Sequence, residues 1–194
     1  MERANQKSTK IGEYLLIFVT ILLSFSAYEY IKIFALILKA RSYENLIQPQ
    51  FFVLLTFFLI LVEYWWNSFN EIFSISRNIS WFFLVLLQPV IFYLVATLLT
   101  PEFTELSNFS ERFYSNFFEN RIQIYILGII LIIVFTKLSE QKFMSLLNLF
   151  RLIYLICCIL GIIFAAETIQ YILSISMLGL TFIFIVKLSW KFFD

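Results

Sequence analysis

The chain of 194 residues contains no histidine, a single aspartate at its last position, Asp194, and only 14% charged residues. Without histidine it lacks the usual imidazole ligands of metal sites and the imidazole base of catalytic triads. With one terminal aspartate it has no intramembrane aspartate pair. We therefore expect no catalytic residue, no metal site and no cofactor, and we interpret the protein as not an enzyme.

Cysteine and glycine are equally scarce. The two cysteines, Cys157 and Cys158, are adjacent in an apolar run and poorly placed to bridge one another, so we expect both to pack as small apolar side chains. The four glycines form neither a phosphate-binding loop nor a Gly-x-x-x-Gly helix-packing motif. The net charge of +1 argues against a nucleic-acid partner.

What the chain has in excess is apolar surface, because 61% of its residues are hydrophobic. Soluble domains contain about 45–50% apolar residues, and a membrane-spanning helix needs about 20 of them in a row. We therefore predict an all-α polytopic transmembrane helical bundle of about six spans, forming one integral membrane domain over residues 1–194 with the lipid bilayer as its first partner. The apolar runs that we assign as spans are 11–38, 51–66, 81–99, 122–135, 147–166 and 169–186.

The distribution of basic residues predicts the orientation, since Lys and Arg accumulate in cytoplasmic loops. With the N-terminus inside, eight basic residues fall on the inner side and four on the outer side. The inner residues are Arg3, Lys7, Lys10, Arg77, Lys137, Lys142, Lys187 and Lys191, and the outer ones are Lys39, Arg41, Arg112 and Arg121. We expect a multi-pass protein of the cell inner (plasma) membrane with both termini in the cytoplasm.

The connection after the third span has the pattern of an amphipathic helix. Thr100 followed by Pro101 is typical of a helix start. The apolar residues Phe103, Leu106, Phe109, Phe113 and Phe117 then recur on one helical face. We predict an interfacial helix over 101–120 on the outer leaflet, with a solvated connector as the alternative.

Polar groups inside spans two and three are the first candidates for function, because they are costly in lipid. Glu63 lies late in span two, and Gln88 precedes Pro89 in the middle of span three. Pro89 has no amide hydrogen for the carbonyl of Val85, which frees an acceptor. Glu63 and Gln88 then either line one polar cavity, or span three is a kinked helix whose Gln bonds to a neighbouring helix.

Three further charges lie within apolar runs. Arg151 is either an anchor at the inner interface or a buried partner of Glu63. Glu29 and Lys32 are three residues apart on one helix face and can form a local charge pair near the outer interface.

A stretch of aromatic and polar positions across residues 51–121 resembles a group of small uncharacterised bacterial polytopic integral membrane proteins. The residues that carry the resemblance are Glu63-Tyr64-Trp65-Trp66, Trp81, Gln88-Pro89, Thr100-Pro101, Phe113-Tyr114 and Asn120-Arg121. The resemblance implies a bacterial inner-membrane protein and no particular activity.

These patterns together favour a non-enzymatic membrane module, a sensor, effector or scaffold subunit that forms a homo-oligomer and works with a cytoplasmic protein partner. The alternative is an ion channel or small transporter that uses the polar groups of spans two and three.

Overall fold

The computed structural model describes the backbone of residues 2–40, 44–75, 79–101, 108–138 and 146–190, and the side chains of 13–40, 46–66, 83–101, 108–138 and 149–186. Within these ranges all regular structure is helical, as predicted. The helices are α1 (Glu2–Lys39), α2 (Glu44–Ile47), α3 (Pro49–Ile75), α4 (Ile79–Leu99), α5 (Phe109–Leu138), α6 (Leu146–Ile163) and α7 (Glu167–Trp190).

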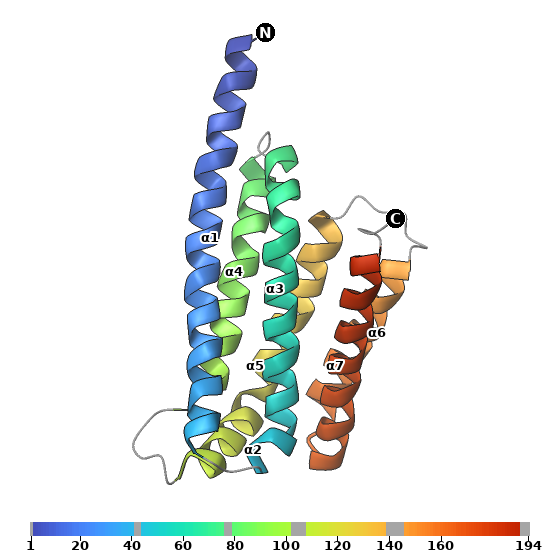
Figure 1. The fold of residues 1–194 in the computed structure, drawn as a ribbon. Helices are drawn as coiled ribbons and strands as arrows, with labels where there is room; N and C mark the ends of the chain where they lie inside the picture. Colours follow the sequence, from blue (N-terminus) through green and yellow to red (C-terminus); the bar gives the residue numbers. More distant parts are fainter. Residues whose placement is uncertain (1, 41–43, 76–78, 102–107, 139–145, 191–194) are drawn as a thin grey trace.

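The six long helices run alternately up and down the bundle, so the Glu2 end of α1 and the Trp190 end of α7 lie at the same end (Figure 1). Helix α1 projects beyond its neighbours at that end (Figure 1). Helix α3 starts with a proline at its first helical position, where no amide donor is needed. Short connections such as residues 164–166 make consecutive helices antiparallel neighbours.

Four helical segments of the described chain are long and apolar enough to cross a membrane: Glu13–Lys39, Pro49–Trp66, Phe109–Leu138 and Glu167–Val186. Two shorter apolar segments, Phe83–Leu99 and Leu149–Ile163, belong to α4 and α6. The fold is therefore that of a helical bundle compatible with a membrane-embedded protein.

The buried side chains form two clusters. The main core lies between α1, α3, α4 and α5 and is built around Tyr30, Phe57, Phe92 and Phe117. The lateral core lies between α5, α6 and α7 and contains Tyr125, Cys157, Cys158, Leu173 and Met177. Helix α5 contributes to both, and α7 also packs along α3, where the rings of Phe52 and Tyr171 meet edge-to-face at 5.7 Å.

The segment predicted as a separate interfacial helix over 101–120 differs from that prediction. Pro101 is not helical, and the Thr100 hydroxyl donates back to the Ala96 carbonyl at 2.8 Å, so Thr100 closes α4 and does not start a helix. Phe103 and Leu106 lie outside the described residues. The described remainder, 109–120, is the first part of the continuous helix α5.

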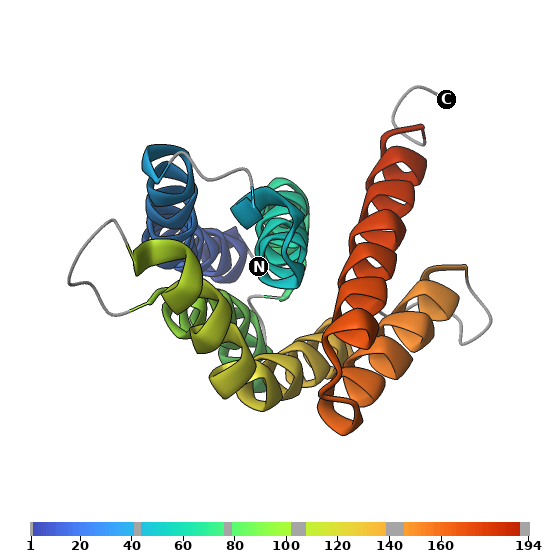
Figure 2. The same cartoon turned by 90° about the horizontal axis from the view of Figure 1, so that it is seen from below.

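The apolar face of this segment is covered by protein. Phe109, Phe113 and Phe117 are at most 2% exposed and belong to the main core. Viewed along the bundle, the first turns of α5 run across its end before the helix turns to follow the others (Figure 2). Asn116 fixes the crossing, because its Nδ2 donates to the Leu98 carbonyl in the last turn of α4 at 2.6 Å. The aromatic face therefore buries itself against the helices and not in the headgroup layer.

Candidate functional site

The carbonyl freed by Pro89 has a partner on another helix. Helix α4 continues through Pro89, so the carbonyl of Val85 loses its usual amide donor. The hydroxyl of Tyr64, on α3, donates to the Val85 oxygen at 3.3 Å in a buried position. Of the two interpretations of the proline, this contact favours a kinked helix whose backbone is satisfied by its neighbour.

Two hydroxyls of α1 complete the same pattern. Ser26 Oγ donates to the Pro89 carbonyl at 2.9 Å, and Tyr30 OH donates to the Phe92 carbonyl at 3.2 Å. Ser26 and Tyr30 are one turn apart and fully buried. Neither residue, nor Tyr64, was among the candidates from the sequence. The only signal was the four-residue spacing of two hydroxyls on an otherwise apolar face of α1.

Gln88 lies among these contacts and makes none of them. The residue is 0% exposed, and both its Oε1 and its Nε2 are buried without a hydrogen-bond partner among the described residues. A buried amide group without a partner costs roughly 1–3 kcal/mol. The predicted bond from Gln88 to a neighbouring helix is therefore absent from the part of the chain that the structure describes.

Glu63 points to another side of α3. It is adjacent to Tyr64, so the two side chains leave the helix about 100° apart, and Tyr64 faces the Val85 carbonyl. Glu63 shares its side of the helix with Thr56, two turns earlier. Thr56 is fully buried, and its hydroxyl has no hydrogen-bond partner among the described residues. A common cavity for Glu63 and Gln88 stays a prediction.

Arg151 lies inside α6, in its second turn, and its side chain is half-buried. The helix begins at Leu146, so Arg151 is part of the regular helix and not of a turn that precedes it. Its proposed pairing with Glu63 stays a prediction as well.

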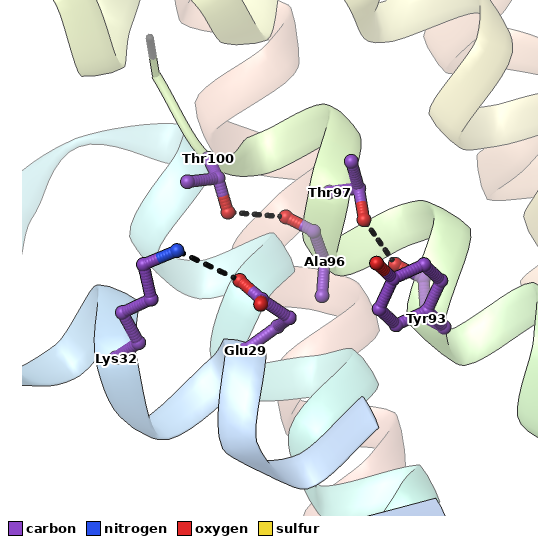
Figure 3. Close-up of polar contacts among 6 residues, drawn as sticks. All are labelled: Glu29, Lys32, Tyr93, Ala96, Thr97 and Thr100. Atoms are coloured by element: carbon purple, nitrogen blue, oxygen red, sulfur yellow. Dashed lines mark hydrogen bonds and ion pairs between the residues drawn. The ribbon is translucent and has the colours of Figure 1, made fainter. Parts of the chain in front are cut away.

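The charge pair on α1 forms as its spacing suggested. Lys32 Nζ lies 3.3 Å from Glu29 Oε2, with the Lys side chain 40% and the Glu side chain 18% exposed. Figure 3 shows the pair beside the last turns of α4, near Tyr93, Thr97 and Thr100. The pair therefore stands at the level at which α4 ends.

A second polar centre, which the sequence did not indicate, joins the three helices of the lateral core. Tyr125 OH donates to Gln170 Oε1 at 2.7 Å, and Gln170 Nε2 donates to the Gly161 carbonyl at 2.9 Å and the Phe164 carbonyl at 2.5 Å. Tyr125 and Gln170 are fully buried. One side chain of α7 thus ties α5 to the end of α6.

Glycine at position 161 permits this arrangement. A Cβ atom there would lie 2.5 Å from two ring carbons of Tyr125, a distance that packed atoms do not reach. About two turns before Gly161 in α6, Tyr154 OH contacts both the Met177 carbonyl, at 2.6 Å, and the Thr181 hydroxyl of α7. Polar contacts at two levels therefore hold the α6–α7 pair in register.

The cysteines pack as expected. Cys157 and Cys158 are buried and free, and the Sγ of Cys158 lies 3.2 Å from the position that a Cβ on Gly128 would take. The described residues contain no cluster of three or more His, Cys, Asp or Glu side chains that could hold a metal ion. Hydroxyls, amides and the Glu29–Lys32 ion pair are among the polar groups that the described helices present.

No protein-family model, no curated protein and no solved structure matches this chain.

Proposed function

We propose that the protein is a non-enzymatic, six-span membrane module of the bacterial inner membrane, with both termini in the cytoplasm, that acts as a homo-oligomeric sensor, effector or scaffold subunit together with a cytoplasmic protein partner. Four apolar helices of spanning length support the membrane location. The common end of α1 and α7 supports an even number of crossings (Figure 1).

The observation that favours a module over a channel is the use of the buried hydroxyls. The hydroxyls of Tyr64, Ser26 and Tyr30 each donate to a carbonyl of α4, so they hold α1 and α3 against α4. Hydrogen bonds of this kind stabilise helix packing in lipid. Because these three side chains are buried and their protons are donated to backbone carbonyls, they are not available as donors to a passing anion or substrate.

Two surfaces of the described chain are candidates for contacts with other proteins, namely the outward apolar faces and the projecting end of α1. Helix α1 has 38 residues, and at 1.5 Å per residue it is about 57 Å long, against a hydrocarbon core of about 30 Å. Its first turns carry Arg3, Lys7 and Lys10. We assign this projecting basic segment to the cytoplasmic partner.

The outward apolar faces include bulky side chains on every long helix. On α1 and α7 they are Tyr14, Ile17, Phe18, Ile21, Phe25, Tyr28, Ile31, Leu38, Ile172, Ile175, Phe182, Ile183 and Val186. Lipid covers such faces in a monomer, and other copies of the chain cover part of them in an oligomer.

Two measurements test the proposal. Reporter fusions after Lys10 and after Asp194 should both report the cytoplasm, and a periplasmic signal from either would overturn the topology. Native mass spectrometry of the purified full chain should show one discrete oligomer that survives dilution in mild detergent. A purely monomeric protein would overturn the oligomeric module.

A second candidate function, an ion channel or small transporter, rests on the unpartnered amide of Gln88. A permeating ion or a file of water would supply the partner that the described side chains do not. Liposomes containing the purified protein would then show a flux whose pH dependence changes in Glu63→Gln, because only the carboxyl titrates. A folded, oligomeric protein without any flux would favour the assembly module.

A further inference from the structure

Five polar side chains gather on the outward flank between α1 and α4, near the end of the bundle opposite the termini. Glu29 and Lys32 come from α1, Tyr93 and Thr97 come from the last turns of α4, and Thr100 directly follows α4 (Figure 3). We call them the α1–α4 polar patch. The hydroxyl contacts inside the bundle do not involve it.

The patch is open to its surroundings and amphipathic. The side chain of Lys32 is 40% exposed, the residue Tyr93 is 42% exposed, and Thr97 is exposed as well. One turn deeper toward the membrane centre, Phe25 on α1 is 60% exposed and Val90 on α4 is 39% exposed. A polar level above an apolar level is the profile of a phospholipid with its headgroup and acyl chains.

The two threonine hydroxyls of the patch can act as acceptors. The Thr97 hydroxyl donates a hydrogen bond to the Tyr93 carbonyl at 2.9 Å, and the Thr100 hydroxyl donates one to the Ala96 carbonyl at 2.8 Å (Figure 3). Each hydroxyl oxygen keeps lone pairs for a donor from outside. Glu29 adds its second carboxylate oxygen, since only Oε2 contacts Lys32.

Beside these acceptors lies one cationic hydrogen-bond donor, the Lys32 ammonium group. The Lys32 ammonium has three hydrogens, and one ion-pair contact, to Glu29, is formed at 3.3 Å. The patch thus offers a cation to a phosphate and a group of acceptors to an N–H donor. Lys32 and Glu29 are one helical turn apart, about 5–6 Å between Cβ atoms, and the threonines lie beside them on α4 (Figure 3).

We propose that the α1–α4 polar patch binds the headgroup of phosphatidylethanolamine, with the phosphate on Lys32 and the ethanolammonium on Glu29 and the threonine oxygens. Choline has no N–H to donate to these acceptors, and a glycerol headgroup brings no cation to the carboxylate. The inference rests on the membrane location in the proposed function. It adds the identity of a specific lipid.

Lipid retention tests the proposal. The purified full chain is equilibrated in detergent with dioleoyl-phosphatidylethanolamine or dioleoyl-phosphatidylcholine at equal concentration, and bound lipid is counted by native mass spectrometry. The wild type should retain the ethanolamine lipid about tenfold better, as expected when a charge-assisted hydrogen bond is lost with choline. Glu29→Gln should equalise the two lipids, and Lys32→Gln should weaken the retention of both.

Lys39→Gln is the matched control, because Lys39 is another exposed lysine of α1, seven residues beyond Lys32 and outside the patch. It should retain both lipids as the wild type does. Circular dichroism establishes that each variant is folded. Excess soluble phosphoethanolamine should not displace the lipid, since it lacks acyl chains for Phe25 and Val90.

Equal retention of the two lipids by the wild type, or an ethanolamine preference that survives Glu29→Gln, would overturn the proposal. Displacement by soluble phosphoethanolamine would also overturn it, because the ligand would then be the free headgroup. These failures differ from failure of the proposed function. Reporter fusions that still show both termini in the cytoplasm would leave the membrane module intact while the lipid site is lost.

Discussion

Gln170 and Gln88 are both fully buried, but they differ in their hydrogen bonding. Gln170, in the lateral core, bonds to Tyr125, to the Gly161 carbonyl and to the Phe164 carbonyl. Gln88, in α4 beside Pro89, has no partner for either amide atom among the described residues. In the lateral core, the Gln170 side chain on α7 therefore links α5 and the end of α6 through hydrogen bonds. In the main core, hydroxyl groups donate to the backbone carbonyls of α4, and Gln88 takes no part in these hydrogen bonds.

The comparison shows that the role of a buried polar residue in a helix depends on which hydrogen-bonding groups the neighbouring helices place against it. In the main core the acceptor freed by Pro89 is reached by Tyr64, so Gln88 is not needed there. In the lateral core the donor Tyr125 and the carbonyls at the end of α6 surround a single amide. Substitutions in the two regions should therefore have effects of different size and sign.

The largest expected effect is at the glycine under the Tyr125 ring. Gly161→Ala places a Cβ 2.5 Å from ring carbons of Tyr125, so the ring or the helix must move. We expect a loss of about 1–3 kcal/mol in unfolding free energy, as for other overpacked cores. Reversible unfolding in mixed micelles, followed by circular dichroism, measures the loss.

Gly179→Ala is the control for that experiment, because nothing lies within 4 Å of the Cβ position there. It should leave stability unchanged or raise it by up to about 1 kcal/mol through helix propensity. If Gly161→Ala were as benign as Gly179→Ala, the close contact between α5 and α6 would be wrong.

The two glutamines themselves give the next effect. Gln170→Leu removes three hydrogen bonds and leaves the Tyr125 hydroxyl without its acceptor, so we expect a loss of about 1–2 kcal/mol. Gln88→Leu removes an unpartnered amide and should be neutral or stabilising in the same unfolding assay. A destabilised Gln88→Leu protein would mean that a group other than the described residues bonds to Gln88 in the folded protein, as the transport alternative expects of water or an ion.

The smallest effect is at the proline. Tyr64→Phe removes the donor to the Val85 carbonyl and should cost about 0.6 kcal/mol, the average for such bonds in a membrane protein. Pro89→Ala restores an amide donor to the same carbonyl, so Tyr64→Phe should cost less in that background. A double-mutant cycle measures this coupling. Strict additivity of the two substitutions would argue against the Tyr64 contact.

Composition and periodicity were enough to predict much of this protein. The excess of apolar residues predicts spanning helices, and four helices of the described chain are long and apolar enough to cross a membrane. The three-residue spacing of Glu29 and Lys32 predicts their ion pair, because it depends on one helix alone. Adjacency of Cys157 and Cys158 likewise predicts two free, buried thiols.

What lay beyond the sequence were the contacts between helices. Residues 109–120 have the pattern of an interfacial helix, yet their phenylalanines pack into the main core. Periodicity shows that a face is apolar but not whether lipid or protein covers it. Similarly, Pro89 predicts a free carbonyl, while only the packing of α3 against α4 brings Tyr64 to it.

The division has one physical reason. Helix formation, apolar length and contacts at three- or four-residue spacing depend on neighbours along the chain, so the sequence by itself determined them. The partner of Gln170 lies 45 residues away at Tyr125, and the donor to Val85 lies 21 residues away at Tyr64. Such distant pairs depend on how helices rotate and cross when they pack, so only the tertiary structure decided that Gln170 is bonded and Gln88 is not.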